Sequence, residues 1–335
     1  MKKAKKVKNK NKKNLKNKRN TTILMKKFPK LKGRAILSPM AGVTDVAFRS
    51  LARKYGAALT VTEFVNSIAI NRGNEKTFDM LKTAPNEKPV AIQLFGNDEK
   101  ELLESAKKIS ENKKTNFDII DINVGCPAYK VIKIGCGSEL LKDKAHLHRL
   151  ISNLVDNINK PVTVKMRLGI NDDKEAVEIA KIIEEAGASA LAVHGRTQKQ
   201  QYSGKANWQK IAEIKRNLQI PVIGNGDVFD QETFYKRLEE SEVEYILIAR
   251  GAIGYPKIFK EIVDKKDYDK TAESQIVDFE EYLKLAVKYK VPFSNIKTHA
   301  LSFTKGLKGS NKLRSKMSGL KTNEELFRIM EESSK

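Results

Sequence analysis

Short apolar runs alternate with amphipathic helical stretches from residue 34 to about residue 264 of this chain. Each run is continuously apolar rather than strictly alternating, which is typical of parallel strands that helices cover. Helical stretches between the runs include residues 100–111, 174–186, 208–217 and 232–238. The runs number eight: Arg34–Ser38, Leu59–Glu63, Pro89–Leu94, Phe117–Ile122, Pro161–Arg167, Ser189–His194, Ile220–Asn225 and Tyr245–Ala249.

A strand followed by a helix, repeated eight times, is the pattern of an α/β protein with a (β/α)₈ barrel. An open, doubly wound sheet is the alternative. It is disfavoured because no Gly-x-Gly-x-x-Gly motif follows the first strand. We therefore predict a closed barrel.

The pattern changes after residue 265, where apolar residues keep helical spacing and no further strand is expected. Three helices are predicted in this part, over residues 271–291, 293–307 and 310–333. The predicted organisation has three parts: a disordered basic tail over residues 1–27, a barrel over residues 28–265 and a small all-helical domain over residues 266–335.

The charge of the chain is strongly positive, with 64 Lys and Arg against 41 Asp and Glu, a net charge of +23. Residues 1–44 contain no acidic residue, and residues 1–27 interleave Lys with Asn and have few apolar residues. This composition predicts disorder. The tail is either a low-complexity extension or a flexible arm for RNA, and Met25 is an alternative start.

A second basic stretch covers residues 282–323, which hold ten Lys and Arg and no acidic residue. Unlike the tail, it has apolar residues at helical spacing, so its charge lies on a folded surface. A basic face on a folded domain favours contact with a nucleic-acid backbone. The candidate contacts include Lys297, Lys305, Lys308, Lys312 and Arg314.

Several protein classes are disfavoured by simple counts. No apolar run approaches the roughly 20 residues of a membrane-spanning helix. The two cysteines, Cys126 and Cys136, cannot build a multi-disulfide scaffold, and with four histidines they make a structural zinc cluster improbable. We expect a soluble, cytoplasmic protein without a metal site.

Functional side chains follow nearly every predicted strand. In a barrel of this type the active site lies where the strands end, so these groups are expected to converge. The segments are Ser38-Pro39-Met40-Ala41-Gly42, Glu63, Gln93, Asn123 with Cys126, Lys165 with Arg167, His194-Gly195-Arg196, Asn225-Gly226-Asp227 and Ala249-Arg250-Gly251.

The loops after the seventh and eighth strands are the usual phosphate-binding position of such barrels. Gly226 and Gly251 let backbone N–H groups approach an anion, and Arg250 adds a positive charge. A bound phosphate group is therefore predicted at this side of the barrel mouth.

Three side chains on other strands point to the rest of the ligand. Gln93 offers an amide, Lys165 a cation inside an apolar strand, and His194 an imidazole. Such a set suits an electron-rich heteroaromatic cofactor that carries a phosphate, as flavin mononucleotide (FMN) does. A sugar-phosphate substrate with Lys165 as Schiff-base nucleophile is the competing interpretation.

The loop after the fourth strand is long and glycine-rich, from Asn123 to Ser138. Cys126 lies just beyond the strand, where a substrate could reach its thiol. The alternatives are an incidental thiol and a redox disulfide with Cys136, although the ten-residue spacing lacks the Cys-x-x-Cys form.

Taken together, these segments resemble the tRNA-dihydrouridine synthase family. The resemblance covers residues about 34–260, with the motifs in family order, and the basic tail lies outside it. The matching motifs are Pro39–Asp45 with Phe48-Arg49, Gln93–Gly96, Asn123–Pro127 with Lys130 and Gly135–Ser138, Val164–Arg167, His194–Thr197, Asn225–Asp227 and Ala249–Gly251.

The resemblance implies an FMN-dependent oxidoreductase that reduces uridines of tRNA to 5,6-dihydrouridine with NADPH or NADH. It implies hydride transfer from reduced FMN to C6 and a proton from Cys126 to C5. Asn123, Lys130 and Arg196 are implied as contacts of the uridine or tRNA. The implied cofactor residues are Pro39, Met40, Ala41, Gln93, Lys165, His194, Asn225, Gly226, Asp227, Ala249 and Arg250.

Because a stacked uridine cannot reach a flavin inside a barrel, the target base is expected to flip out of the tRNA. Two rival functions remain: an FMN barrel that acts on a free small molecule, such as a dihydropyrimidine or dihydroorotate oxidoreductase, and a non-catalytic RNA-binding barrel. A monomer is expected. The target uridine and the preference between NADPH and NADH are not readable from one sequence.

Overall fold

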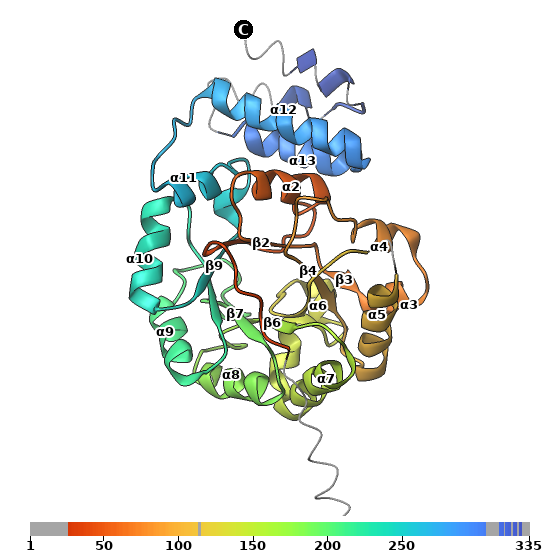
Figure 1. Cartoon of the computed structure of the whole chain (residues 1–335), viewed down its shortest axis with the longest axis vertical. Coiled ribbons are helices and arrows are strands. Elements are labelled where there is room, and N and C mark those ends of the chain that lie inside the picture. The colour runs from red at the N-terminus through yellow and green to blue at the C-terminus, as the bar shows by residue number, and fades with distance from the viewer. Residues whose placement is uncertain are drawn as a thin grey trace, which may run out of the picture.

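The computed structural model describes residues 26–112, 115–305, 315–317, 319–322, 324–326 and 328–329. Its strands are all parallel and run in the order β2-β1-β9-β8-β7-β6-β5-β4-β3, and β2 also pairs with β4. This last pairing closes a ring of eight strands, with the two-residue β3 attached to β4 (Figure 1). The predicted (β/α)₈ barrel is confirmed. The strands are β1 (Ala35–Leu37), β2 (Leu59–Val61), β3 (Val65–Asn66), β4 (Val90–Phe95), β5 (Ile119–Val124), β6 (Val162–Arg167), β7 (Ala190–His194), β8 (Val222–Asn225) and β9 (Tyr245–Ile248).

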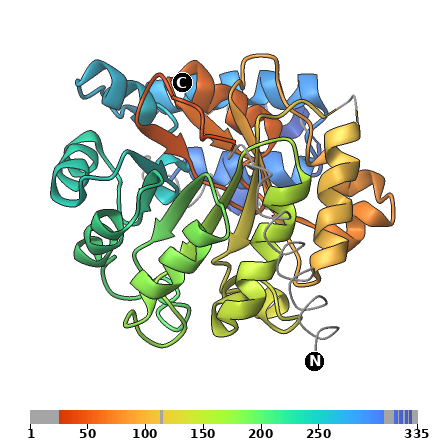
Figure 2. The ribbon, with the colours of Figure 1, turned by 60° about the horizontal axis from the view of Figure 1, so that its bottom comes forward.

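Helices surround the ring on its outside, as the view in Figure 2 shows. Several begin at a side-chain cap: Oδ1 of Asp98, for example, accepts hydrogen bonds of 2.9 Å from the N–H groups of Lys100 and Glu101. The helices of the barrel part are α2 (Val46–Lys54), α3 (Ser67–Asn71), α4 (Glu75–Asp79), α5 (Glu99–Glu111), α6 (Tyr129–Ile132), η1 (Gly137–Lys142), α7 (Lys144–Asn157), α8 (Ala176–Glu185), α9 (Trp208–Asn217), α10 (Gln231–Ser241), η2 (Arg250–Ala252) and α11 (Ile258–Asp264).

The strand residues divide into two sets because successive side chains point to opposite faces of a sheet. One set packs under the helices. The other forms a separate apolar cluster that includes Leu31, with Phe28 packed against it. This second set faces the barrel interior. Polar residues that follow its members at every second position towards the strand ends therefore also face inward. The strand members of the inner cluster are Ile36, Leu59, Val61, Ala91, Ile119, Ala190, Ala192, Ile223 and Leu247.

The helical C-terminal region begins with α12 (Ala272–Tyr289) and α13 (Phe293–Phe303), which lie next to α2 in Figure 1. The predicted boundary at residue 265 falls between α11 and α12. Half of the residues of the helix expected over residues 310–333 lie outside the described residues, and residues 315–317, 324–326 and 328–329 within it are helical. The expected tail lies outside the described residues apart from Lys26 and Lys27. Within the part of the chain that the structure describes, no helix has both the length and the apolar character needed to cross a membrane.

Candidate active site

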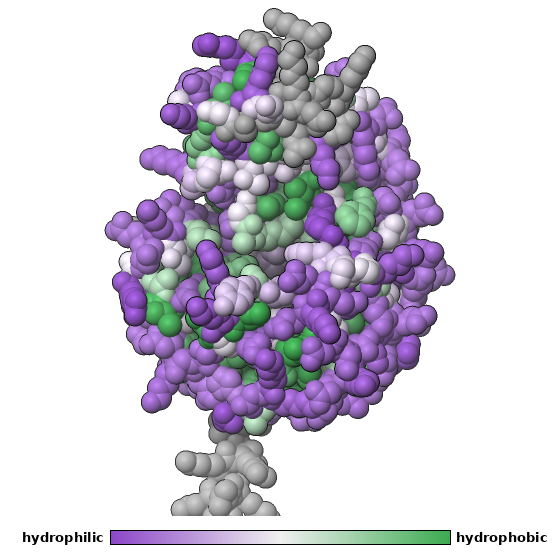
Figure 3. Space-filling view, turned by 180° about the vertical axis from the view of Figure 1, so that it is seen from behind, coloured by the Kyte–Doolittle hydropathy of each residue, from purple (hydrophilic) through white to green (hydrophobic). Residues whose placement is uncertain are grey.

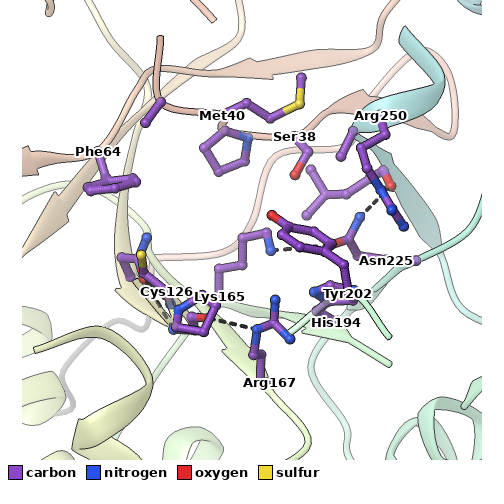
Figure 4. Close-up of a pocket in the computed structure, with 18 of the residues that line it drawn as sticks. Ser38, Met40, Phe64, Cys126, Lys165, Arg167, His194, Tyr202, Asn225 and Arg250 are labelled. Atoms are coloured by element: carbon purple, nitrogen blue, oxygen red, sulfur yellow. Dashed lines mark hydrogen bonds between the residues drawn. The ribbon is translucent and has the colours of Figure 1, made fainter. Parts of the chain in front are cut away.

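A cavity of about 630 Å³ opens where the barrel strands end. On this face the space-filling view shows pale and green surface around a hollow, within a mostly purple surrounding (Figure 3). Figure 4 shows the lining residues converging from separate strands and loops. Asn123 and Cys126 line this cavity. So does every residue predicted to bind a cofactor: Pro39, Met40, Ala41, Gln93, Lys165, His194, Asn225, Gly226, Asp227, Ala249 and Arg250.

Some predicted substrate residues lie elsewhere. Lys130 is exposed on α6, and Lys305 is exposed just after α13. Lys297 is half-buried, and its ammonium group lies 3.4 Å from the carbonyl oxygen of Leu320. Arg196 is 2% exposed and does not reach the cavity lining. Lys308, Lys312 and Arg314 lie outside the described residues.

A buried amide network holds Gln93 in place. Nε2 of Gln93 donates to Oδ2 of Asp121 at 2.6 Å, while Oε1 of Gln93 accepts from Nδ2 of Asn123 at 2.9 Å. Thr163 donates to the other carboxylate oxygen of Asp121 at 2.5 Å. Burial raises the pKa of Asp121, and these two donors and the nearby Lys165 oppose that shift. The network fixes Gln93 in a single orientation towards the cavity.

Two basic groups near the centre of the site have lowered pKa values. Burial, with a contribution from the neighbouring Arg167, lowers the pKa of Lys165 to about 8. Burial and the surrounding cations, Lys165 first among them, lower the pKa of His194 to about 2, so its imidazole is neutral at pH 7. The site therefore places Lys165, which can lose its charge near pH 8, close to the uncharged imidazole of His194.

The predicted phosphate side of the cavity carries an acid between two arginines. Oδ2 of Asp227 accepts from Arg196 at 2.7 Å and from the N–H of Ala206 at 2.8 Å, and Oδ1 accepts from Arg250 at 2.9 Å. Although burial alone would raise the pKa of Asp227, the hydrogen bonds from Arg196 and Ala206 keep it below its usual value. The carboxylate thus positions the two arginines, and contact of Arg250 and the nearby backbone with a phosphate stays a prediction.

The turn after β8 depends on the backbone conformation of Gly226. Its φ of 134° disfavours any residue with a side chain, and a Cβ there would lie 2.6 Å from the Cβ of Ala206. The next residue, Asp227, itself has a positive φ of 53°. Gly226 lines the cavity in this conformation, and its carbonyl oxygen accepts from Nε1 of Trp208 at 3.0 Å.

The loop after β5 is folded so that Cys126 faces the same cavity. Oδ1 of Asn123 accepts from the N–H of Cys126 at 2.9 Å, and the carbonyl oxygen of Cys126 accepts from the N–H and hydroxyl of Ser138. Gly137 makes this contact possible, since a Cβ there would lie 2.7 Å from the Cys126 oxygen. Asn123 therefore positions Cys126, and a contact of its amide with the uracil edge stays a prediction.

The thiol of Cys126 is held in its neutral form. Burial raises its pKa, and the N–H of Ala128, Arg167 and Lys165 oppose this shift only in part. Both Cys126 and Cys136 are free thiols in the structure. A neutral thiol beside a cavity can donate a proton.

Sequence reasoning missed an aromatic rim around the cavity. Tyr129 is 72% exposed, Tyr202 60% and Phe229 48%, and Phe64 stands on the side of Cys126 (Figure 4). The guanidinium of Arg250 lies 4.9 Å from the Tyr202 ring centre and 5.5 Å from that of Phe229. Tyr129 begins the four-residue helix α6 and the other three lie in loops, so periodicity gives no signal for any of them. By contrast, strand alternation would have found the inward-facing Asp121, two residues before Asn123.

The geometry separates two ends of one cavity. Arg250 and Asn225 lie at one end in Figure 4, Cys126 and Phe64 at the other, and Lys165 lies between them. Such an arrangement can hold an anion at one end and protonate a ligand at the other, with a cation that stabilises charge between. No group of three or more His, Cys, Asp or Glu side chains suited to a metal ion occurs among the described residues.

Comparison with known proteins points to one family. The model of the family described as dihydrouridine synthase (Dus) matches residues 36–334. The chain is 42% identical over 233 residues to tRNA-dihydrouridine synthase B of Pseudomonas aeruginosa, covering 69% of each chain. It is 32% identical over 308 residues to the probable tRNA-dihydrouridine synthase of Aquifex aeolicus, covering 90% of this chain and 96% of that one.

Among solved structures, the chain is similar to histamine dehydrogenase from Rhizobium sp. 4-9, with a TM-score of 0.58 and 11% sequence identity. The match covers 79% of this chain and 51% of that one. At this identity the likeness concerns the barrel fold alone.

Proposed function

The chain belongs to the dihydrouridine synthase family, and we propose that it reduces specific uridines of tRNA to 5,6-dihydrouridine. FMN would occupy the barrel cavity, with NADPH or NADH as the reductant. The observation that carries the proposal is the convergence of Gln93, Lys165, Arg250 and Cys126 on one cavity. The tRNA substrate is taken from the names of the relatives.

The residues present fit FMN. The cavity of about 630 Å³ lies within the usual range of cofactor sites, ~300–1,000 Å³. Its donors match the ligand: Gln93 for the ring edge, Lys165 for charge on the ring, and Arg250 with the Gly226 backbone for the phosphate. Reduced FMN, when bound, would supply a hydride to C6 of the uracil ring.

Cys126 would complete the reduction by giving a proton to C5. The raised pKa of its thiol keeps the proton in place at neutral pH, which a general acid requires. The hydrogen bond from its backbone N–H to Asn123 fixes the stretch of backbone that carries the thiol. Lys130 and Lys133 are exposed on and beside α6, which leaves them available to RNA phosphates.

Access to the cavity requires a flipped base. The exposed rings of Tyr129 and Tyr202 at the rim offer surfaces on which nucleobases can stack. Stacking on such rings does not depend on the base, so the rim would receive the tRNA without choosing the target. The choice would depend on how the whole tRNA is oriented.

The helical C-terminal region would orient the tRNA. Residues 282–323 carry ten basic residues and no acid, and Lys305 is exposed. Lys308, Lys312 and Arg314, which lie outside the described residues, stay predicted contacts of the tRNA. Lys297 would contribute from its half-buried position. A cytoplasmic location and a monomeric state remain predictions of the sequence.

The first experiment is the visible spectrum of the purified protein, followed by addition of NADPH without air. An oxidised-flavin spectrum that bleaches would support a flavoenzyme, and a gain of two hydrogen atoms on unmodified tRNA would then establish the substrate. A colourless protein that does not take up FMN would overturn the cofactor assignment. The Schiff-base reading of Lys165 would then be tested with borohydride.

A further inference from the structure

The first barrel loop, residues 38–45, touches two parts of the molecule at once. On its inner side Pro39, Met40, Ala41 and Val43 line the cavity. On its outer side the carbonyl oxygen of Val43 lies 2.9 Å from Nε2 of His299, which belongs to α13. A residue of the helical region therefore holds the backbone of a cavity-lining residue.

The loop keeps its own shape through internal bonds. Thr44 and Met40 are joined by three hydrogen bonds, with the Met40 N–H donating to the Thr44 hydroxyl at 3.0 Å. The N–H of Gly42 donates to the carboxylate of Glu63 at 2.5 Å. The bonds between Met40 and Thr44 fix the shape of the loop, and its position over the cavity depends on Glu63, just after β2, and on the contacts from the helical region.

The anchoring side chains are deeply buried. His299 is 1% exposed and lies with its ring centre 4.7 Å from that of Phe48 and 4.2 Å from that of Tyr282. Since Nε2 of His299 donates to a carbonyl, it carries the ring hydrogen, and the same atom lies 3.4 Å from Oδ2 of Asp45. The imidazole cannot turn away without losing both rings and the carbonyl.

Tyr282 contacts the same loop through Asp45, the last residue of the loop. Its Oδ1 caps α2 by accepting from the N–H of Phe48 at 3.0 Å, and its Oδ2 accepts from the hydroxyl of Tyr282 at 3.0 Å. Tyr282 is a fully buried residue of α12. Both long helices of the C-terminal region thus reach the end of the loop that lines the cavity.

We propose that His299 and Tyr282 are positioning residues for the first barrel loop, residues 38–45. The helical region would then be a structural part of the flavin pocket as well as a surface for tRNA. The inference rests on the proposed function because it takes flavin as the ligand. The inference requires that loss of the His299–Val43 contact or of the Tyr282–Asp45 contact weakens flavin binding, although neither His299 nor Tyr282 lines the cavity.

The sharpest test compares two hydroxyl deletions in the full-length chain. Tyr282→Phe removes the bond to Asp45, and Tyr55→Phe removes another bond between barrel and helical region, from Tyr55 to Asp278. The FMN dissociation constant is measured by quenching of flavin fluorescence, with thermal unfolding as a check of folding. We expect the dissociation constant to rise about fivefold for Tyr282→Phe, as for one lost hydrogen bond of ordinary net strength, and to stay unchanged for Tyr55→Phe.

His299 provides the second arm. His299→Leu should weaken FMN binding and change the fine structure of the bound flavin's visible band, and His299→Gln, which keeps an N–H donor, should restore part of both. Should His299→Leu fail to fold, the two tyrosine variants decide. Equal FMN affinity in Tyr282→Phe and wild type would overturn the inference, whereas a wild type that binds no FMN would instead overturn the proposed function.

Discussion

The ammonium group of Lys165 donates a hydrogen bond to Oδ1 of Asn225 over 3.2 Å and so links β6 to β8 across the mouth of the barrel. Asn225 is fixed from its other side, where Nδ2 donates to the carbonyl oxygen of Leu247 at 2.8 Å. The amine is therefore held in place whether or not it is charged. Because the pKa of Lys165 is lowered to about 8, its charge changes within the working range of an enzyme.

The rate of flavin reduction by NADPH should follow this titration. We expect a constant rate between about pH 6 and 7 and a decrease as the pH rises through 8, where Lys165 loses the charge that stabilises the reduced ring. Stopped-flow absorbance measures the rate. Lys165→Met should be slower than wild type below pH 8 and should lack the decrease, and an unchanged profile in this variant would contradict the assignment.

The lowered pKa of Lys165 has the opposite effect on stability, which rises with pH where the rate of flavin reduction falls. Between pH 8 and 10.5 the unfolded chain binds the Lys165 proton and the folded chain does not, so this group makes the apoprotein more stable as the pH rises through that window. Urea unfolding of wild type and Lys165→Met at several pH values isolates the contribution. A fall in stability from this residue over that range would contradict the lowered pKa.

Replacement of Cys126 should separate protonation from binding. We expect Cys126→Ala to lower dihydrouridine formation about 100-fold or more, because the general acid is lost, while NADPH still reduces the flavin and tRNA still binds. The matched control is Cys136→Ala, since Cys136 is also a free thiol but does not line the cavity. Cys136→Ala should keep its turnover, and a similar loss in both variants would remove Cys126 from its role.

The raised pKa of Cys126 makes a separate chemical prediction. A thiol that stays protonated at pH 7 should react slowly with iodoacetamide, and its reaction should accelerate only at a pH above the range of an ordinary cysteine. Mass spectrometry of the alkylated peptide measures the rate. Rapid alkylation at pH 7 would mean that Lys165 and Arg167 hold a thiolate instead.

Asp227 should affect the phosphate of the cofactor rather than its ring. Asp227→Asn keeps the size of the side chain but removes the charge that orients Arg250. We expect FMN to bind about tenfold more weakly, as for one lost charge-assisted hydrogen bond, and riboflavin, which has no phosphate, to bind equally well. Fluorescence titrations with the two ligands provide the comparison, and an equal loss for both would show a general disturbance of the loop.

The strands could be predicted because each parallel strand is apolar on both of its faces, and the polar residues Gln93, Lys165 and His194 then had to meet at the strand ends. Arg196 shows the limit. It follows His194 at strand spacing, yet β7 ends at His194 and the guanidinium turns into the protein towards Asp227. Tyr202 lies in a loop and Tyr129 in the four-residue helix α6, and the path of such short segments depends on tertiary contacts that no periodicity records.

Arg49, part of a motif found in the sequence, proves to be a buried structural residue. It forms an ion pair with Glu87 at 2.7 Å, both side chains 0% exposed, and it donates to the carbonyl oxygen of Thr44 at 2.6 Å. Removal of one partner leaves a buried charge, so Glu87→Ala should destabilise the fold by about 3–5 kcal/mol. The partly exposed pair Lys54–Glu281 is the control, and Glu281→Ala should cost at most about 1 kcal/mol. Denaturant unfolding of both variants tests this, and similar losses would contradict it.

Charge reversal in the helical region should weaken tRNA binding without touching the flavin. We expect the double variant Lys305→Glu with Lys308→Glu to lose tRNA affinity, because each replaced lysine no longer neutralises a phosphate. The slope of log K against log salt should become shallower by about one unit for each lost contact. The flavin spectrum and its reduction by NADPH should match wild type.

The control for this variant is Lys181→Glu with Lys236→Glu, two exposed lysines on α8 and α10 of the barrel's outer surface. It makes the same change in net charge at a distance from the acid-free stretch, so it separates a local contact from the general attraction of a basic protein for RNA. Binding is followed by fluorescence anisotropy of labelled tRNA at several salt concentrations. Equal weakening in both double variants would assign tRNA binding to net charge alone, and the helical region would lose its role in orienting the substrate.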